Sequence, residues 1–305
     1  MGVFLVWYSY QSTSIEDREK IVQYISQANL FWVGTSVALG ILSHVSRAIR
    51  WNYLLQPLGY QSKLSNNILI ILMAYFANLG IPRSGEIFRA TALATYEGVP
   101  FEKGFGTIVT ERVIDLIMLL LVVTIAVAMQ TEVLLALLEE KGFNFTGILF
   151  LLGIGITVAF TVFYFIKKST HSLAYKIKNF INGLLEGVFS IFKMKRKWAF
   201  LAHTLFIWGV YIGMFWVIKY TVTETMLLGL SEILVAFVFG AFAMSATNGG
   251  IGLYPIAVSK ALAIYGISPP SGDAFGWIMW ISQTLMVILF GAISFVVLPL
   301  WNRKN

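Results

Sequence analysis

Residues 77–89 read Ala77-Asn78-Leu79-Gly80-Ile81-Pro82-Arg83-Ser84-Gly85-Glu86-Ile87-Phe88-Arg89, and this stretch decides the fold. It is polar and helix-breaking, yet apolar runs flank it at residues 68–76 and 105–129. Lipid offers no hydrogen-bond partners to the backbone, so a Gly-Ile-Pro break at membrane depth needs cover from protein or a wet cavity. The stretch therefore predicts a broken, re-entrant helix hairpin, and an ordinary cytoplasmic loop is the alternative.

Three charged residues, Arg83, Glu86 and Arg89, make this break a candidate site. A charged side chain at the centre of a membrane segment costs at least about 2.5 kcal/mol. We therefore expect these residues to serve a substrate pathway rather than stability.

Further charges lie in the apolar segment 106–129, where Glu111, Arg112 and Asp115 occupy the first turns. Glu111 and Asp115 are four apart and share a helix face, while Arg112 and Asp115 can pair at a spacing of three. We expect this cluster to oppose the charges of the break. A solvated helix end is the alternative.

Arg47 and Arg50 end the span predicted at residues 30–51, three apart on one helix face. They either belong to the pathway or snorkel to lipid head groups. The predicted pathway residues are Arg47, Arg50, Asn78, Arg83, Glu86, Arg89, Glu111, Arg112 and Asp115.

The composition indicates a polytopic, all-α membrane protein. Of 305 residues, 58% are hydrophobic and only 12% are charged, and the mean hydropathy is +0.78. A soluble surface needs roughly twice that share of charge. The absence of cysteine excludes disulfides and thiolate metal sites. The net charge of +7 is concentrated in loops, so it reports orientation in the membrane rather than a nucleic-acid partner.

A second break, Thr247-Asn248-Gly249-Gly250-Ile251-Gly252-Leu253-Tyr254-Pro255, interrupts the apolar sequence of the C-terminal half. Paired Gly/Pro breaks in two halves point to an inverted-repeat transporter. We predict halves at residues 1–130 and 147–305, with about six spanning helices and two re-entrant hairpins. The alternative is that both breaks only accommodate helix packing. The predicted hinge residues are Gly80, Pro82, Gly85, Asn248, Gly249, Gly250, Gly252 and Pro255. Helix N-termini near Ser84 and Gly252 would suit an anion.

The remaining segments predict the orientation. Residues 1–10 are too short to span, so a first helix clipped at its start is expected, and Ser14 with Asp17 resembles the N-cap of an interfacial helix. Residues 167–197 hold eight Lys and Arg against one acid, which predicts a cytoplasmic loop with an amphipathic helix. The other predicted spans or half-spans are 147–166, 198–220, 231–246, 256–267 and 274–298. We expect a multi-pass protein of the bacterial cytoplasmic membrane with its C-terminus inside.

Several motifs together resemble the lysylphosphatidylglycerol synthase transmembrane-region family, whose members are flippase-like and of which many are uncharacterised. The motifs are Tyr75–Glu86, Thr110–Asp115, Ser46–Trp51 and Gly249–Gly252. The resemblance covers nearly the whole chain and implies that the charged residues of these segments line a lipid pathway. The family often has Pro-Gly-Gly in the second hairpin, where this chain has Asn248 before Gly249. Members that make aminoacylated lipid carry a C-terminal transferase domain, and this chain ends at Asn305 without one, so translocation rather than synthesis is expected.

The leading hypothesis is a flippase or transporter, not an enzyme, that moves an anionic phosphate-bearing lipid or a polyprenyl-linked carrier between leaflets. Three arginines (Arg83, Arg89, Arg112) would engage the phosphate, and three carboxylates (Glu86, Glu111, Asp115) would hold the arginines or relay protons. One alternative is an intramembrane lipid-modifying enzyme using those carboxylates, although zinc-protease and nucleophile-elbow motifs are absent. Another is a scaffold for envelope glycosyltransferases. No cofactor or metal is predicted, and no nucleotide-binding loop is present. A homo-oligomer is possible from the sequence.

Overall fold

The computed structural model describes residues 2–131, 189 and 193–303, and every regular element in these ranges is helical. The helices are α1 (Gly2–Ser12), α2 (Ile15–Ser26), α3 (Leu30–Leu55), α4 (Leu64–Gly80), α5 (Ser84–Glu97), α6 (Phe101–Met129), α10 (Lys197–Ile218), α11 (Leu230–Ala246), α12 (Leu253–Ala263) and α13 (Pro269–Trp301). Short 3-10 turns follow α3, α10 and α11. The prediction of an all-α protein is confirmed for these residues.

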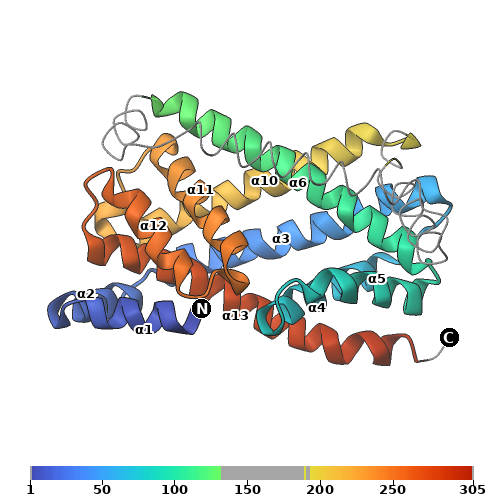
Figure 1. Cartoon of the computed structure of the whole chain (residues 1–305), viewed down its shortest axis with the longest axis horizontal. Coiled ribbons are helices and arrows are strands. Elements are labelled where there is room, and N and C mark those ends of the chain that lie inside the picture. Colours follow the sequence, from blue (N-terminus) through green and yellow to red (C-terminus); the bar gives the residue numbers. More distant parts are fainter. Residues whose placement is uncertain (1, 132–188, 190–192, 304–305) are drawn as a thin grey trace, which may run out of the picture.

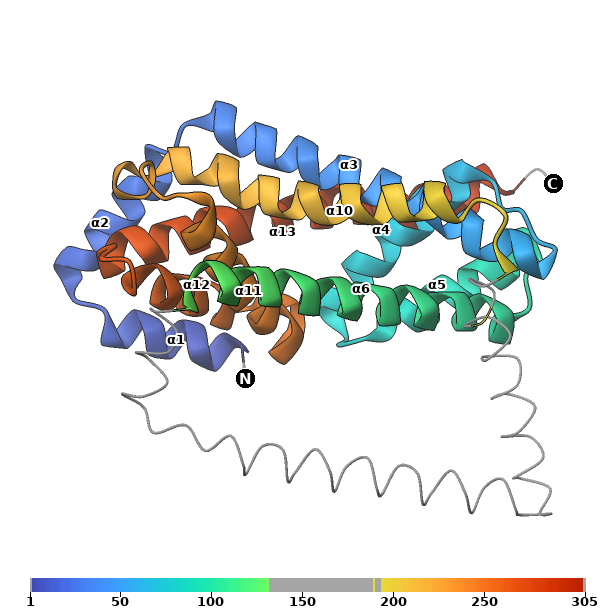
Figure 2. The ribbon, with the colours of Figure 1, turned by 90° about the horizontal axis from the view of Figure 1, so that it is seen from above.

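The long helices α3, α6, α10 and α13 run along the long axis of the molecule, and α3 lies beside α10 (Figures 1 and 2). Three segments are long and apolar enough to cross a membrane: Phe101–Met129, Lys197–Thr221 and Pro269–Trp301. The pair Ile15–Ser26 and Leu30–Leu58, bent by 73°, makes a fourth if it is one span. The described residues thus hold three or four candidate spans. The span predicted at 147–166 and most of the predicted basic loop lie outside them.

The first broken hairpin consists of α4 and α5. With 17 residues, α4 is about 25 Å long, shorter than the roughly 30 Å of a hydrocarbon core. The chain leaves the helix at Ile81, and Arg83 adopts a left-handed conformation with φ of 60° before α5 begins at Ser84. The predicted break and the predicted helix start near Ser84 are confirmed.

Gly85 allows the two arms of this hairpin to approach closely. A Cβ at this position would collide with the carbonyl oxygen of Ala74 on α4. The backbone N–H of Gly85 donates to Oδ1 of Asn78 over 2.8 Å, so the side chain of α4 satisfies a free N–H of the first turn of α5.

The second broken hairpin consists of α11 and α12, and glycine makes its turn. Gly249, Gly250 and Gly252 have φ of 62°, 76° and 74°, a region that residues with a Cβ rarely adopt. Trp280 Nε1 of α13 donates to the carbonyl oxygen of Gly249 over 2.8 Å, which fixes the turn against the neighbouring long helix.

The tips of the two hairpins meet in the middle of the molecule (Figure 1). Asn248 Nδ2 donates to the carbonyl oxygen of Leu79 over 2.8 Å, so a side chain of the second break caps the end of α4. Two half-length hairpins that touch near the midpoint agree with the sequence prediction, while the inverted relation of the two halves stays a prediction.

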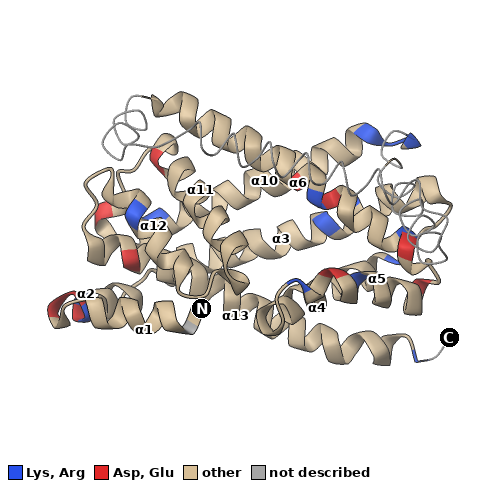
Figure 3. Cartoon of the chain, in the orientation of Figure 1, with Lys and Arg blue, Asp and Glu red and all other residues tan. Residues whose placement is uncertain are grey.

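Charged residues gather at the two ends of the long axis and in one interior region where α3, α5 and α6 come together (Figure 3). The ends are where a membrane protein meets water and head groups. The interior region is therefore the part of the described chain where charge must be explained by function or by pairing.

Candidate functional site

Five buried ionic side chains from three helices form the centre of the site. Arg47 and Arg50 come from α3, Arg89 from α5, and Glu111 and Asp115 from α6. The side chains of Arg47, Arg50, Arg89 and Glu111 are no more than 3% exposed, and that of Asp115 is 14% exposed. The helical spacings of three and four place each helix's pair on one face, which directs them into the same interior region.

Glu111 accepts hydrogen bonds from three guanidinium groups. Its Oε1 lies 2.9 Å from Arg47 Nη1 and 2.9 Å from Arg50 Nη2, and its Oε2 lies 2.7 Å from Arg89 Nη2. These are the short distances typical of charge-assisted bonds. Glu111 therefore ties α3 and α5 to α6 at a single carboxylate.

Asp115 bridges the two arginines of α3 a second time. Its Oδ2 lies 2.8 Å from Arg47 Nη1 and its Oδ1 lies 3.2 Å from Arg50 Nη2. Two hydroxyls of α10 accept from the same arginines: Tyr211 from Arg47 over 3.1 Å, and Thr204 from Arg50 over 3.1 Å. The pairing orients both guanidinium groups from two sides.

Trp51 supports the third arginine. The guanidinium of Arg89 lies over the Trp51 ring, 4.2 Å from its centroid, in a cation–π contact that is strengthened by burial. Trp51 Nε1 donates to Thr107 Oγ1 over 2.9 Å, so the ring itself is held against α6.

Arg112 and Glu86 form the outer edge of the cluster. Arg112 Nε lies 3.6 Å from Glu86 Oε1, and Arg112 Nη1 lies 3.7 Å from Asp115 Oδ2. Both distances exceed those of a hydrogen bond. The side chain of Arg112 is also 43% exposed, so this arginine is the one in the cluster that is open to a ligand.

A small polar cavity adjoins Arg112. It has a volume of about 10 Å³, close to that of one water-sized probe. Its lining comes from both arms of the first hairpin and from α6: Ala74, Tyr75, Asn78, Gly85, Glu86, Arg89 and Arg112. Glu86 Oε2 and Arg89 Nε, on two of the lining residues, are buried and have no hydrogen-bond partner among the described residues. The lining residues therefore hold an unpaired acceptor and an unpaired donor.

The cluster carries one excess positive charge. Four arginines (Arg47, Arg50, Arg89, Arg112) face three carboxylates (Glu86, Glu111, Asp115). Removing charges from water costs several kcal/mol per ion, and only pairing offsets it. An anion placed beside Arg112 would balance the remaining charge.

The structure brings together seven of the nine predicted pathway residues, and Asn78 lines the adjoining cavity. Arg83 is placed elsewhere, exposed at the tip of the first hairpin. Because Arg47 and Arg50 are buried and paired, the alternative that they snorkel to head groups is wrong. Glu111 is fully buried, so the alternative of a solvated helix end is wrong as well.

Sequence reasoning did not find Trp51, Thr107, Thr204 or Tyr211. Trp51 follows Arg50 directly, and Thr107 lies four residues before Glu111, so a search along these helix faces would have found both. Thr204 and Tyr211 lie seven apart on one face of α10, but no sequence signal connects that helix to the cluster. Among the described residues, no group of three or more His, Asp or Glu side chains could hold a metal ion.

Comparison with known proteins agrees with the motifs. The family model for the lysylphosphatidylglycerol synthase transmembrane region matches residues 1–291. The UPF0104 membrane protein MJ1595 of Methanocaldococcus jannaschii is 35% identical over 100 residues, which make up 32% of this chain and 30% of that protein. Glycosyltransferase AglD of Haloferax volcanii is 28% identical over 102 residues, 33% of this chain and 16% of that protein. The chain thus aligns with less than a third of the length of either relative, and no solved structure matches.

Proposed function

Since this chain belongs to the lysylphosphatidylglycerol synthase transmembrane-region family, we propose that it is a lipid translocator. Its substrate is an anionic lipid with a phosphate in the head group, which it moves between the leaflets of the membrane. The members of the ionic cluster divide this work between holding the site and binding the phosphate.

The observation that carries the proposal is the excess positive charge at the broken hairpin. Arg47, Arg50 and Arg89 are held by short hydrogen bonds to Glu111 and so serve as a rigid base. Arg112 has only longer contacts, and its planar guanidinium can offer two parallel N–H groups to one phosphate. A lone phosphate in hydrocarbon is costly, and a cation beside it lowers that cost.

The meeting of the hairpin tips supports movement through the same place. In inverted-repeat transporters, broken helices meet near the bilayer midplane and one repeat rocks against the other. Here the contact between Asn248 and Leu79 joins the two tips. Parting of the tips would open a path along the hairpins past Arg112, with Arg83 at the exposed tip as an earlier contact for the head group.

Leaflet exchange of labelled lipid in proteoliposomes tests the proposal. We expect exchange of an anionic phospholipid, and Arg112→Gln should reduce its rate at least about tenfold, the loss expected for a charge-assisted hydrogen bond. Arg196→Gln is the matched control, because Arg196 is exposed at the N-terminal end of α10. Equal exchange rates for Arg112→Gln and wild type in folded protein would refute the role of Arg112. Absence of exchange for every lipid tried would refute translocation.

A second candidate is handling of a polyprenyl-linked carrier, or assembly with a glycosyltransferase; one similar protein is named a glycosyltransferase. A polyprenyl phosphate has the same phosphate chemistry for Arg112. Exchange of a labelled polyprenyl phosphate, with a phosphatidylglycerol arm run in parallel, separates this candidate from phospholipid translocation. Co-purification of a stoichiometric glycosyltransferase, together with tolerance of Arg112→Gln, would favour a scaffold.

An intramembrane enzyme is less well supported by the geometry. Both oxygens of Glu111 accept bonds from arginines, and so do both oxygens of Asp115. A general acid or base must reach the proton that it transfers. Glu86, one oxygen of which is buried without a partner in the described part of the chain, is the carboxylate of the cluster that remains available.

A further inference from the structure

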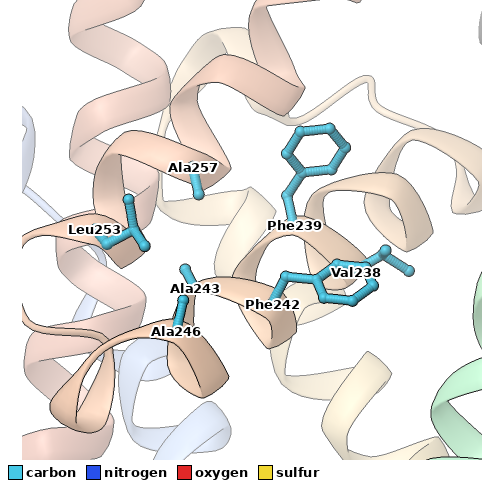
Figure 4. A pocket seen from close by; sticks show the side chains of 7 residues that line it. All are labelled: Val238, Phe239, Phe242, Ala243, Ala246, Leu253 and Ala257. Carbon is cyan, nitrogen blue, oxygen red and sulfur yellow. The ribbon is translucent and has the colours of Figure 1, made fainter. Parts of the chain in front are cut away.

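An apolar groove lies between the arms of the second hairpin, on the other side of the contact between the tips. Its volume is about 340 Å³, at the lower end of the range for ligand pockets. The lining is entirely hydrocarbon and comes from α11 and α12: Val238, Phe239, Phe242, Ala243, Ala246, Leu253 and Ala257 (Figure 4). The three alanines leave the space, and the two phenylalanine rings border it.

The groove is open at the surface of the described chain, beside exposed apolar side chains. Phe242 is 53% exposed and Phe239 is 36% exposed, and α11 also packs against α6, whose Leu116 and Leu120 are exposed as well. A groove that faces lipid is filled by hydrocarbon, since an empty one would deprive its lining of dispersion contacts. The lining offers no polar group, so the groove suits the apolar chain of a lipid.

The groove and the polar cavity lie within the length of one lipid molecule. Asn248 contacts Leu79, Ala246 is two residues before Asn248, and Asn78 is one before Leu79. At 3.8 Å per residue step, the Cα atoms of Ala246 and Asn78 are no more than about 20 Å apart. One leaflet, with its head groups, is about 20 Å thick.

We propose that the groove between α11 and α12 is the binding site for one acyl chain of the phospholipid whose phosphate binds at Arg112. The inference rests on the proposed function, because it assigns the second half of the same ligand. Two parts of the protein then share the lipid: Arg112 of α6, beside the first hairpin, binds its phosphate, and the second hairpin binds its chain. If the tips part, the two ends of the lipid would move with different helices: the head group with α6 and the acyl chain with α11 and α12.

Photolabelling tests this site. The probe is phosphatidylglycerol with a diazirine in one acyl chain, present as a trace component of phosphatidylcholine vesicles that contain the whole protein. After irradiation, the label on each residue is mapped by mass spectrometry. We expect roughly fivefold more label on the groove lining than on Leu116 and Leu120 of α6, because lipid without a site contacts all exposed apolar residues alike.

Ala257→Leu places three further carbons in the groove and should bring the label down to the level of α6. Ala128→Leu adds the same carbons to an exposed position of α6 and should leave the label unchanged. If Ala257→Leu does not fold, Ala246→Leu at the exposed rim gives the same test. Equal label on groove and α6 in the wild type would overturn the inference, as would enrichment that neither leucine variant lowers.

Two other occupants are distinguished in the same experiment. Preferential labelling of the groove by a polyprenyl phosphate probe, with none by the phosphatidylglycerol probe, would overturn the assignment to an acyl chain. In a separate arm, a photoreactive amino acid at position 246 that cross-links to a second copy of the chain would assign the groove to an oligomer instead. Labelling reports binding without movement, so a labelled groove in a protein without leaflet exchange would refute translocation and leave the chain site standing.

Discussion

At the scale of single residues, Glu111 has the largest consequence for the site. It is the one carboxylate in the described chain that bonds to arginines from both α3 and α5, and it is fully buried. Its loss would leave three buried guanidinium groups with fewer acceptors. Burial of an ion pair adds little net stability, but breaking the pair leaves an uncompensated charge.

Glu111→Gln should therefore destabilise the protein by about 3–5 kcal/mol, as measured for broken buried ion pairs. Thermal unfolding in detergent, followed by loss of the monodisperse peak, measures the effect. The matched control is Glu102→Gln, because Glu102 lies on the same helix and is exposed. Comparable melting of the Gln variants at positions 111 and 102 would show that Glu111 does not hold the three helices together.

A pH-dependent contribution is expected at Glu224, in the loop before α11. Partial burial raises the pKa of this carboxyl, but hydrogen bonds from Ser268 and Ser271 outweigh burial and hold the pKa below its ordinary value of 4.5. The Ser268 N–H and hydroxyl each donate over 2.9 Å. A lowered folded pKa gives stability that is present above about pH 4.5 and is lost as the pH falls through the folded value.

Melting temperatures of wild type and Glu224→Gln should therefore differ at neutral pH and converge at acidic pH. Ser268→Ala removes a donor and should reduce the same difference. A difference in melting temperature that stays constant down to acidic pH would contradict a stabilising role of the ionised Glu224.

The residues of the site were predictable to different degrees. Charge within apolar sequence was sufficient to find Arg47, Glu111 and their neighbours, because a charged side chain in a membrane segment is costly and is rarely kept without a role. The choice between snorkelling and pairing for Arg47 depends on where α6 lies. The spacing of residues along one helix does not show the position of another helix. Tyr211 was missed for the same reason: an aromatic residue in an apolar helix has many possible partners.

At the scale of elements, Gly and Pro were read correctly where they break a helix and less well where they start or pack one. The helix predicted from residue 106 begins at Phe101, directly after Pro100, and Gly104 in its first turn packs against Leu93 of α5. The helix predicted from 274 begins at Pro269, since proline fits the first turn, where its missing N–H is not needed. The breaks after Gly80 and before Leu253 were found because glycine and proline occur together there.

Gly85 and Gly80 give a matched test of the first hairpin. An alanine at position 85 would collide with the Ala74 carbonyl, whereas an added Cβ at position 80 has no atom within 4 Å. Gly85→Ala should destabilise the protein by about 1–3 kcal/mol, the cost of overpacking, and Gly80→Ala should be close to neutral. Thermal unfolding of the pair compares them directly. Equal stability of the two variants would mean that α4 and α5 do not pack as closely as described.

At the scale of the whole molecule, α13 sets the distance between the two ends. Its 33 residues extend for about 50 Å. Ser268, directly before its first residue, donates a hydrogen bond to Glu224. Asn302, directly after its last residue, exchanges hydrogen bonds of 3.0 Å with Asn66 at the start of α4. Residues near Glu224 and residues near Asn66 therefore lie at opposite ends of the protein.

The positive-inside rule predicts which end faces the cytoplasm. The described basic residues Lys195, Arg196 and Arg303 predict that the Asn302 end faces the inside. The chain has no cysteine, so single cysteines report without background. In intact cells, Leu227→Cys should react with a membrane-impermeant maleimide, because Leu227 is 96% exposed and three residues from Glu224. Gln61→Cys, exposed at the Asn66 end, should react only after permeabilisation. The reverse pattern would invert the topology and place the open end of the first hairpin, near Asn66, on the outer side. The head group would then enter the site of Arg112 from the opposite leaflet.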